Sequence, residues 1–71
     1  MNFEAALKRK LKLQGVEFVE ATDATLIFKI NGSSFSVPRP LNDGGWTTAQ
    51  QELIANTLEY LGLEFWPLDF H

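Results

Sequence analysis

Apolar residues near the start of the chain recur at every fourth position, as in one stripe along an α-helix. The stripe consists of Phe3, Leu7 and Leu11. Asn2 has a side-chain oxygen suited to cap the first turn, and Gly15 can take the left-handed conformation that often ends a helix. The pattern therefore predicts a first helix between these two residues. Its polar side carries Glu4, Lys8 and Lys12.

Three stretches rich in β-branched and aromatic residues come next, at 16–20, 25–30 and 33–37. Such residues favour strands. Asn31-Gly32 favours a two-residue hairpin turn between the last two strands, because both residues tolerate a positive φ. This turn fixes the register. The pairs expected on the covered face are Ile30 with Ser33, Phe28 with Phe35 and Leu26 with Val37. The pairs expected on the face left to water are Lys29 with Ser34 and Ile27 with Ser36.

A second helix is predicted after a proline-containing bend and a loop that ends at Trp46. Thr47 or Thr48, each three residues before a glutamine, supplies the spacing of a capping box. Apolar residues then follow at helical spacing, namely Leu53, Ile54, Leu58 and Leu61. Gly62 is placed to end the helix, so that Leu63 packs back over the last turn.

The last nine residues, 63–71, form an apolar tail in which large side chains alternate with others. Trp66, Leu68 and Phe70 alternate with Pro67, Asp69 and His71, which predicts an extended segment or an edge strand. Two interpretations stay open. An exposed tail would offer aromatic anchors to a partner, whereas a tail that folds back would complete a small core. The same two alternatives apply to Trp46.

Together these elements predict one α+β domain over residues 1–71, in the order α-β-β-β-α. Two helices cover one face of a three-stranded antiparallel sheet, and a short apolar tail follows. A chain of this size buries only about 60% of the surface that its unfolded state exposes, which leaves little room for a deep substrate pocket. No cofactor is therefore expected.

The composition narrows the class of protein further. The 71 residues include no cysteine, which excludes disulfides, thiolate catalysis and cysteine-rich zinc sites. Neither a signal peptide nor a membrane-spanning run is recognisable, so no membrane partner is expected. These observations predict a soluble, cytoplasmic protein.

The net charge of −3 is distributed unevenly. The first twelve residues hold four cations (Lys8, Arg9, Lys10, Lys12) against Glu4, whereas the rest of the chain holds two cations against eight acids. From Pro40 onward there is no lysine or arginine. The basic end is suited to nucleic acid, and the acidic part to a basic protein surface.

Short motifs between Gly15 and Pro40 resemble those of the HicA-type mRNA interferase toxins. The matching segments are Val16-Glu17-Phe18, Ile27-Phe28 before Gly32, Phe35-Ser36-Val37-Pro38-Arg39, and Leu61-Gly62-Leu63. The resemblance implies a fold related to double-stranded-RNA-binding domains and an activity in RNA cleavage. It covers most of the chain.

The sequence departs from that family at the position of its catalytic histidine. Where the family has Gly-Ser-His before the second strand, this chain reads Asp23-Ala24-Thr25. A threonine hydroxyl does not exchange a proton readily near neutral pH, whereas histidine does. Pro40 also stands where the family tends to have a basic residue or a histidine. We therefore expect the chain not to be an enzyme.

No other set of residues replaces the missing histidine. His71 is the only histidine and stands at the end of the sequence. Glu17, Glu20 and Asp23 have irregular spacing around a turn, which favours solvated carboxylates over a magnesium site. No metal site is predicted.

The sequence thus predicts a non-catalytic protein that binds another protein. The expected role is that of an inhibitor or accessory of nucleic-acid-handling machinery, including the phage anti-defence kind. The residues expected at this protein interface are Trp46, Glu52, Glu59, Phe65, Trp66 and Phe70. The alternative is a HicA-type toxin that binds or cleaves RNA. The residues expected to meet RNA are Lys8, Arg9, Lys12 and Lys29. A homodimer through the tail is a third possibility.

Overall fold

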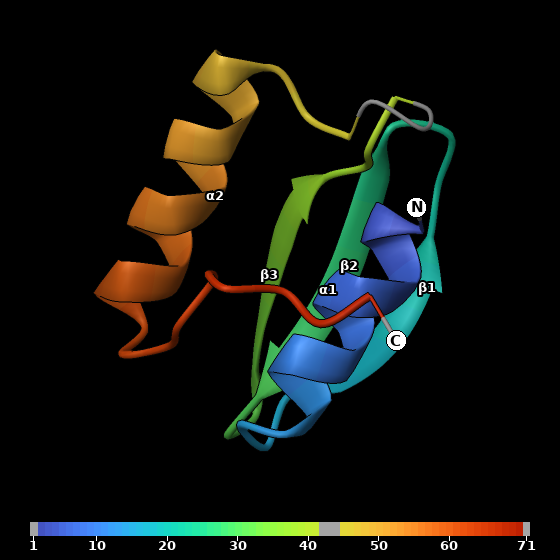
Figure 1. Ribbon diagram of the computed structural model, residues 1–71. Helices are drawn as coiled ribbons and strands as arrows, with labels where there is room; N and C mark the ends of the chain where they lie inside the picture. The colour runs from blue at the N-terminus through green and yellow to red at the C-terminus, as the bar shows by residue number, and fades with distance from the viewer. Residues whose placement is uncertain (1, 42–44, 71) are drawn as a thin grey trace.

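A computed structural model of the chain describes residues 2–41 and 45–70 and shows the predicted element order (Figure 1). The helices are α1 (Phe3–Lys12) and α2 (Thr48–Tyr60). The strands are β1 (Glu17–Ala21), β2 (Thr25–Ile30) and β3 (Ser33–Pro38). The α-β-β-β-α prediction is confirmed.

The three strands form an antiparallel sheet in the order β1-β2-β3. Asn31 and Gly32 have φ angles of 50° and 81°, as the predicted turn requires. All five predicted pairs between β2 and β3 are present, among them Phe28 with Phe35. The pairing of β1 with β2 shifts between Phe18 and Glu20, which makes a bulge.

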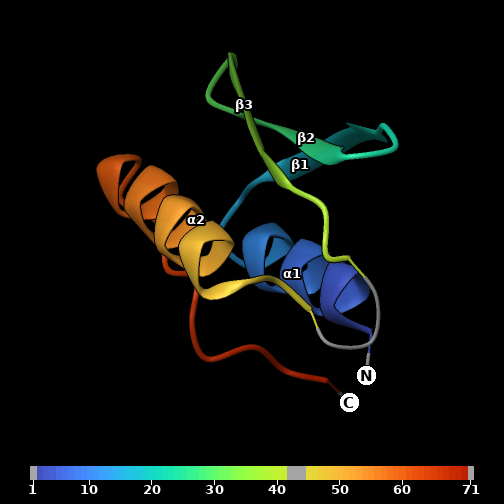
Figure 2. The same ribbon diagram turned by 90° about the horizontal axis from the view of Figure 1, so that it is seen from above.

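Both helices lie on the same face of the sheet, and the tail lies on the far side of the helices (Figure 2). Helix α1 is therefore enclosed between the sheet and the tail.

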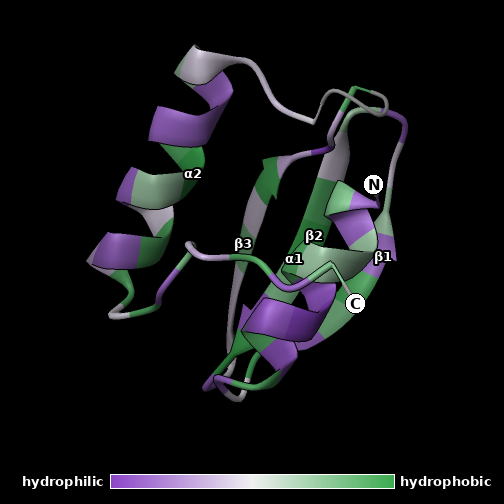
Figure 3. Cartoon of the chain, viewed as in Figure 1, coloured by the Kyte–Doolittle hydropathy of each residue, from purple (hydrophilic) through white to green (hydrophobic). Residues whose placement is uncertain are grey.

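The C-terminal half of α1 consists largely of hydrophilic residues, whereas β2 is largely hydrophobic (Figure 3). The buried core consists of Ala6, Leu7, Leu11, Val16, Leu26, Phe28, Val37, Trp46, Ile54, Leu58 and Leu68. In the described part of the chain, neither helix has the length and apolar character needed to cross a membrane.

Both helices begin and end as their sequences predict. The Asn2 side chain accepts a hydrogen bond from the Ala5 N–H, and Thr47 forms the capping box with Gln50. Gly15 and Gly62 have φ angles of 85° and 76°. The residue after each glycine donates its N–H to a carbonyl five residues earlier, in the pattern of a Schellman motif.

Strand β1 begins one residue later than the sequence pattern predicts. Val16 is 4% exposed, and its N–H donates to the Leu11 carbonyl at 3.0 Å. That bond closes the end of α1, so the backbone of Val16 belongs to the helix end and the ladder starts at Glu17.

Candidate protein-binding surface

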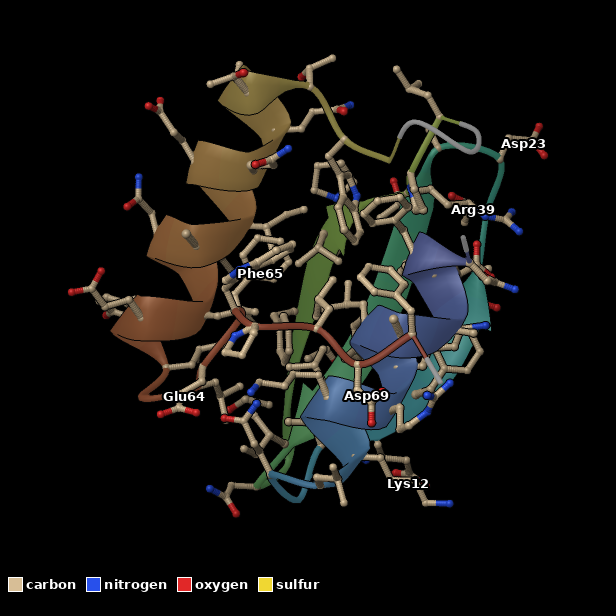
Figure 4. All side chains as sticks on the ribbon, viewed as in Figure 1. Lys12, Asp23, Arg39, Glu64, Phe65 and Asp69 are labelled. Atoms are coloured by element: carbon tan, nitrogen blue, oxygen red, sulfur yellow. The ribbon has the colours of Figure 1, made fainter. Side chains whose placement is uncertain are left out.

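The tail is fastened to α1 through the side chain of Gln14. The Gln14 amide donates to the Glu64 carbonyl at 2.8 Å, and its oxygen accepts from the Glu64 N–H at 2.7 Å. Lys10 lies 3.7 Å from the Glu64 carboxylate, and Arg9 donates to the Asp69 carbonyl at 3.1 Å. Figure 4 shows Asp69 where the tail crosses α1, and Glu64 at the start of the tail beside the end of α2. These contacts place the tail along the helix.

The predicted edge strand in the tail is not found within the described residues 63–70. Leu68 is buried, and the Phe70 ring packs edge to face on Phe3 with centroids 4.9 Å apart. Because the tail lies against helices, it has no strand beside it to form a ladder. Of the two interpretations of the tail, Leu68 and Phe70 therefore follow the one in which the tail folds back and completes the core.

Trp46 belongs to the core and not to the exposed surface. Its side chain is 5% exposed, and its indole N–H donates to the Pro38 carbonyl at 2.7 Å. The rings of Phe3 and Phe65 lie 5.7 and 5.6 Å away, measured between centroids. This placement corrects the expectation that Trp46 faces a partner, because its ring is enclosed on both sides.

A groove of about 380 Å³ runs between α2 and the tail. It is lined by Thr48, Gln51, Glu52, Ala55, Phe65 and Trp66. Trp66 is 61% exposed, whereas Phe65 is half-buried and its ring contacts Trp46 below. Three of the residues predicted to bind a protein, Glu52, Phe65 and Trp66, thus meet in one groove.

The outward side of α2 carries acidic and apolar residues together. Glu52 and Glu59 are seven residues apart, which places both exposed carboxylates on one side of the helix. Leu53 is 55% exposed and Tyr60 is 90% exposed, at the same spacing. The sequence interpretation missed Tyr60, although its position off the Ile54-Leu58 stripe indicated an outward side chain.

The residues predicted to meet RNA do not all share one surface. Lys8, Arg9 and Lys12 line a groove of about 550 Å³ between α1 and β1. Lys29 is the cross-strand partner of Glu17, and it lies on the face of the sheet that points away from the helices. Within this groove, Lys8 bonds to Glu4 at 3.0 Å and lies 4.0 Å from the Phe18 ring centroid. Part of the positive charge is therefore already engaged inside the molecule.

Glu4 joins α1 to the bend after β3. Its carboxylate accepts from Arg39 at 2.6 Å as well as from Lys8, and Arg39 also donates to the Thr22 carbonyl at 2.8 Å. Burial alone would raise the pKa of Glu4, but the hydrogen bonds and positive charges of Arg39 and Lys8 outweigh it, so the pKa lies below its usual value.

This lowered pKa predicts a pH dependence of stability. A group with a lowered pKa in the folded state stabilises the fold above its unfolded pKa, about 4.3, and loses that effect as the pH falls through the folded value. We expect Glu4→Gln to cost about 1 to 2 kcal/mol at pH 7 and much less at pH 3. Urea unfolding of both proteins across this range measures the difference. A cost that stays constant with pH would contradict the role of the charge.

The position that resembles the catalytic histidine site holds Thr25 in a local turn. The Thr25 N–H donates to the Thr22 hydroxyl at 3.1 Å, and the Thr25 carbonyl accepts from the Thr22 N–H at 2.8 Å. Within residues 2–41 and 45–70, no group of three or more histidine, cysteine or acidic side chains is arranged to hold a metal ion. The contacts of Thr25 at this turn are thus local hydrogen bonds with Thr22. His71 lies outside the described residues.

No protein-family model, curated protein or solved structure matches the chain. The resemblance to HicA-type toxins therefore stays a prediction from the sequence motifs. The function has to be argued from the surface itself.

Proposed function

We propose that the protein is a non-catalytic interaction domain that binds a basic surface of another protein through the groove between α2 and the tail. The observation that carries this proposal is the exposed Trp66 beside Glu52, on a part of the chain without lysine or arginine. Tryptophan in a pocket is a frequent anchor of protein interfaces. The surrounding carboxylates select a partner of opposite charge.

The acidic surface suits a partner whose own ligand is a nucleic acid. A protein that binds nucleic acid presents cations to phosphates, and the exposed Glu52 and Glu59 offer the same sign of charge as phosphates. The proposed role is therefore an inhibitor or accessory that occupies such a basic groove. Anti-defence proteins of phages are one setting for this role.

The test is capture of partners from an extract of the source cells, with and without nuclease treatment. We expect capture to survive nuclease and to fall by about tenfold when Glu52 and Glu59 are both replaced by arginine, or when Trp66 is replaced by alanine. Glu20→Arg is the matched control, because Glu20 is exposed on β1, outside the groove. Capture by this variant should stay unchanged.

Two results would overturn the proposal. Capture that persists in the Glu52→Arg/Glu59→Arg variant would show that the acidic side of α2 does not bind the partner. Capture that disappears with nuclease, and that Lys12→Ala weakens, would favour RNA binding in the groove between α1 and β1.

A further inference from the structure

The α2 side of the groove that contains Trp66 carries acceptor oxygens that the rest of the fold does not use. Glu52 and Gln51 both line this groove. Among residues 2–41 and 45–70, the Glu52 carboxylate has no hydrogen bond and no ion pair. The Gln51 amide donates its N–H to the Trp46 carbonyl at 3.1 Å, and within the same residues its oxygen accepts from no donor. A carboxylate and an amide oxygen are therefore open to an occupant.

The tail side of the groove is aromatic. Trp66 is 61% exposed, so much of its indole ring is uncovered beside Glu52. The Phe65 ring lies edge to face with the Trp66 ring, with centroids 6.0 Å apart. The groove thus combines an open aromatic ring with oxygen acceptors.

Both sides of the groove are attached to the same buried residue. Gln51 bonds to the Trp46 carbonyl, and the Phe65 ring packs on the Trp46 ring with centroids 5.6 Å apart. Trp46 itself is 5% exposed. A groove whose sides are held in this way loses little conformational freedom when it binds, which favours affinity.

The charge around the groove favours a cation. Glu52 belongs to the lining itself, and Glu59 lies on the same side of α2, two turns farther along. The positive end of the α2 dipole acts in the opposite sense, but Thr47 and Gln50 already bond to N–H groups there in the capping box. An anionic occupant would meet carboxylates and no lysine or arginine from this part of the chain.

A guanidinium group uses these contacts better than other side chains do. It is planar, so it can stack on an indole ring while the N–H groups at its edge donate to oxygen acceptors beside the ring. The ammonium group of lysine is compact and strongly hydrated, and it lacks this flat face. An apolar side chain would cover Glu52 without giving its carboxylate a donor.

We propose that the groove between α2 and the tail binds an arginine side chain of the partner. Its guanidinium stacks on Trp66 and donates hydrogen bonds to the Glu52 carboxylate and the Gln51 amide oxygen. The inference rests on the proposed function, because it names the side chain through which a basic partner enters the groove.

The experiment adds short peptides to the isotope-labelled full chain and follows its NMR signals. The probe is acetylated and amidated Gly-Gly-Arg-Gly-Gly, and the comparison peptides carry lysine, leucine or citrulline, the neutral counterpart of arginine, in the middle. We expect the arginine peptide to shift the indole N–H of Trp66 and the amides of Gln51 and Glu52, but not the indole N–H of Trp46. The lysine peptide should bind at least about threefold more weakly, and the citrulline and leucine peptides at least about tenfold more weakly.

Two substitutions and a matched control test the contacts. Glu52→Gln keeps the size of the side chain and removes its charge, so the arginine peptide should bind about tenfold more weakly. Trp66→Leu keeps an apolar contact without a ring, so the preference for arginine over lysine should disappear. Glu59→Gln removes the same charge outside the lining, roughly 10 Å along the helix from Glu52, where salt at about 0.15 M screens it. It should change binding less than about twofold, and circular dichroism checks that all three variants fold.

Three results would overturn the inference. The first is equal binding of the arginine and lysine peptides, weakened alike by Glu52→Gln and Glu59→Gln, which would indicate a general acidic surface. The second is tightest binding of the leucine peptide, and the third is an unshifted Trp66 signal with the arginine peptide at millimolar concentration. Partner capture decides the proposed function separately. If capture still depends on Glu52, Glu59 and Trp66, only the arginine inference fails, whereas capture that ignores these residues overturns the proposed function as well.

Discussion

Replacement of Trp46 by alanine is expected to lower the free energy of unfolding by about 3 to 5 kcal/mol, the range for a large aromatic residue lost from a core. The loss combines three contributions. The ring is 5% exposed and fills space between Phe3 and Phe65, and its N–H bond to the Pro38 carbonyl disappears. A domain of 71 residues has a total stability of roughly 4 to 10 kcal/mol, so this loss is a large share of it.

The second tryptophan of the chain is the matched control. Trp66 is 61% exposed, so Trp66→Ala should cost less than about 1 kcal/mol. Trp46→Phe keeps a ring in place and removes only the N–H donor, so it should be intermediate and still fold. Urea unfolding followed by circular dichroism measures all three variants. Equal costs for Trp46→Ala and Trp66→Ala would contradict the placement of Trp46 in the core.

Removal of residues 63–71 is expected to have the second large effect. Leu68 is buried, and Leu63, Phe65 and Phe70 pack against the core. Each large apolar side chain removed from water contributes about 1.5 to 3 kcal/mol when fully buried. Since most of these side chains are only partly buried, we expect a loss of about 3 to 6 kcal/mol, which leaves the shortened chain partly unfolded at 37 °C.

Milder variants keep this prediction testable if the shortened chain does not fold. Leu68→Ala should cost about 2 kcal/mol or more, because the side chain leaves a cavity over α1. Glu64→Gln removes only the exposed ion pair with Lys10 and keeps the backbone bonds to Gln14, so it should cost at most about 1 kcal/mol. Thermal unfolding of the three proteins gives the order. A shortened chain as stable as the full chain would show that the tail does not complete the core.

Local features of the sequence were enough to predict the elements and the hairpin register. Asn31-Gly32 allows essentially one turn geometry, and that turn determines every pair between β2 and β3. The capping box at Thr47 and the glycine that ends each helix are also short-range signals. Such signals depend on residues only a few positions apart, so a single sequence contains them completely.

The candidate site depends on contacts between residues that are far apart in the sequence, and no short motif predicts such contacts. Arg39 reaches Glu4 across 35 positions, and Gln14 reaches Glu64 across 50. The sequence interpretation placed Trp46 and the tail only as alternatives, because the direction of a loop side chain follows from how the helices pack. The alternation of Trp66, Leu68 and Phe70 suggested a strand, but the same spacing arises here in a segment that crosses a helix.

Because one tryptophan is buried and the other is exposed, the fluorescence of the protein reports on two different places. An enclosed indole emits at shorter wavelength than a hydrated one, and a dissolved quencher reaches the hydrated ring far more easily. The emission of Trp46 therefore reports whether the core is intact, whereas the emission of Trp66 reports what lies in the groove beside Glu52. Folding and occupation of the surface can thus be followed separately in one unlabelled sample.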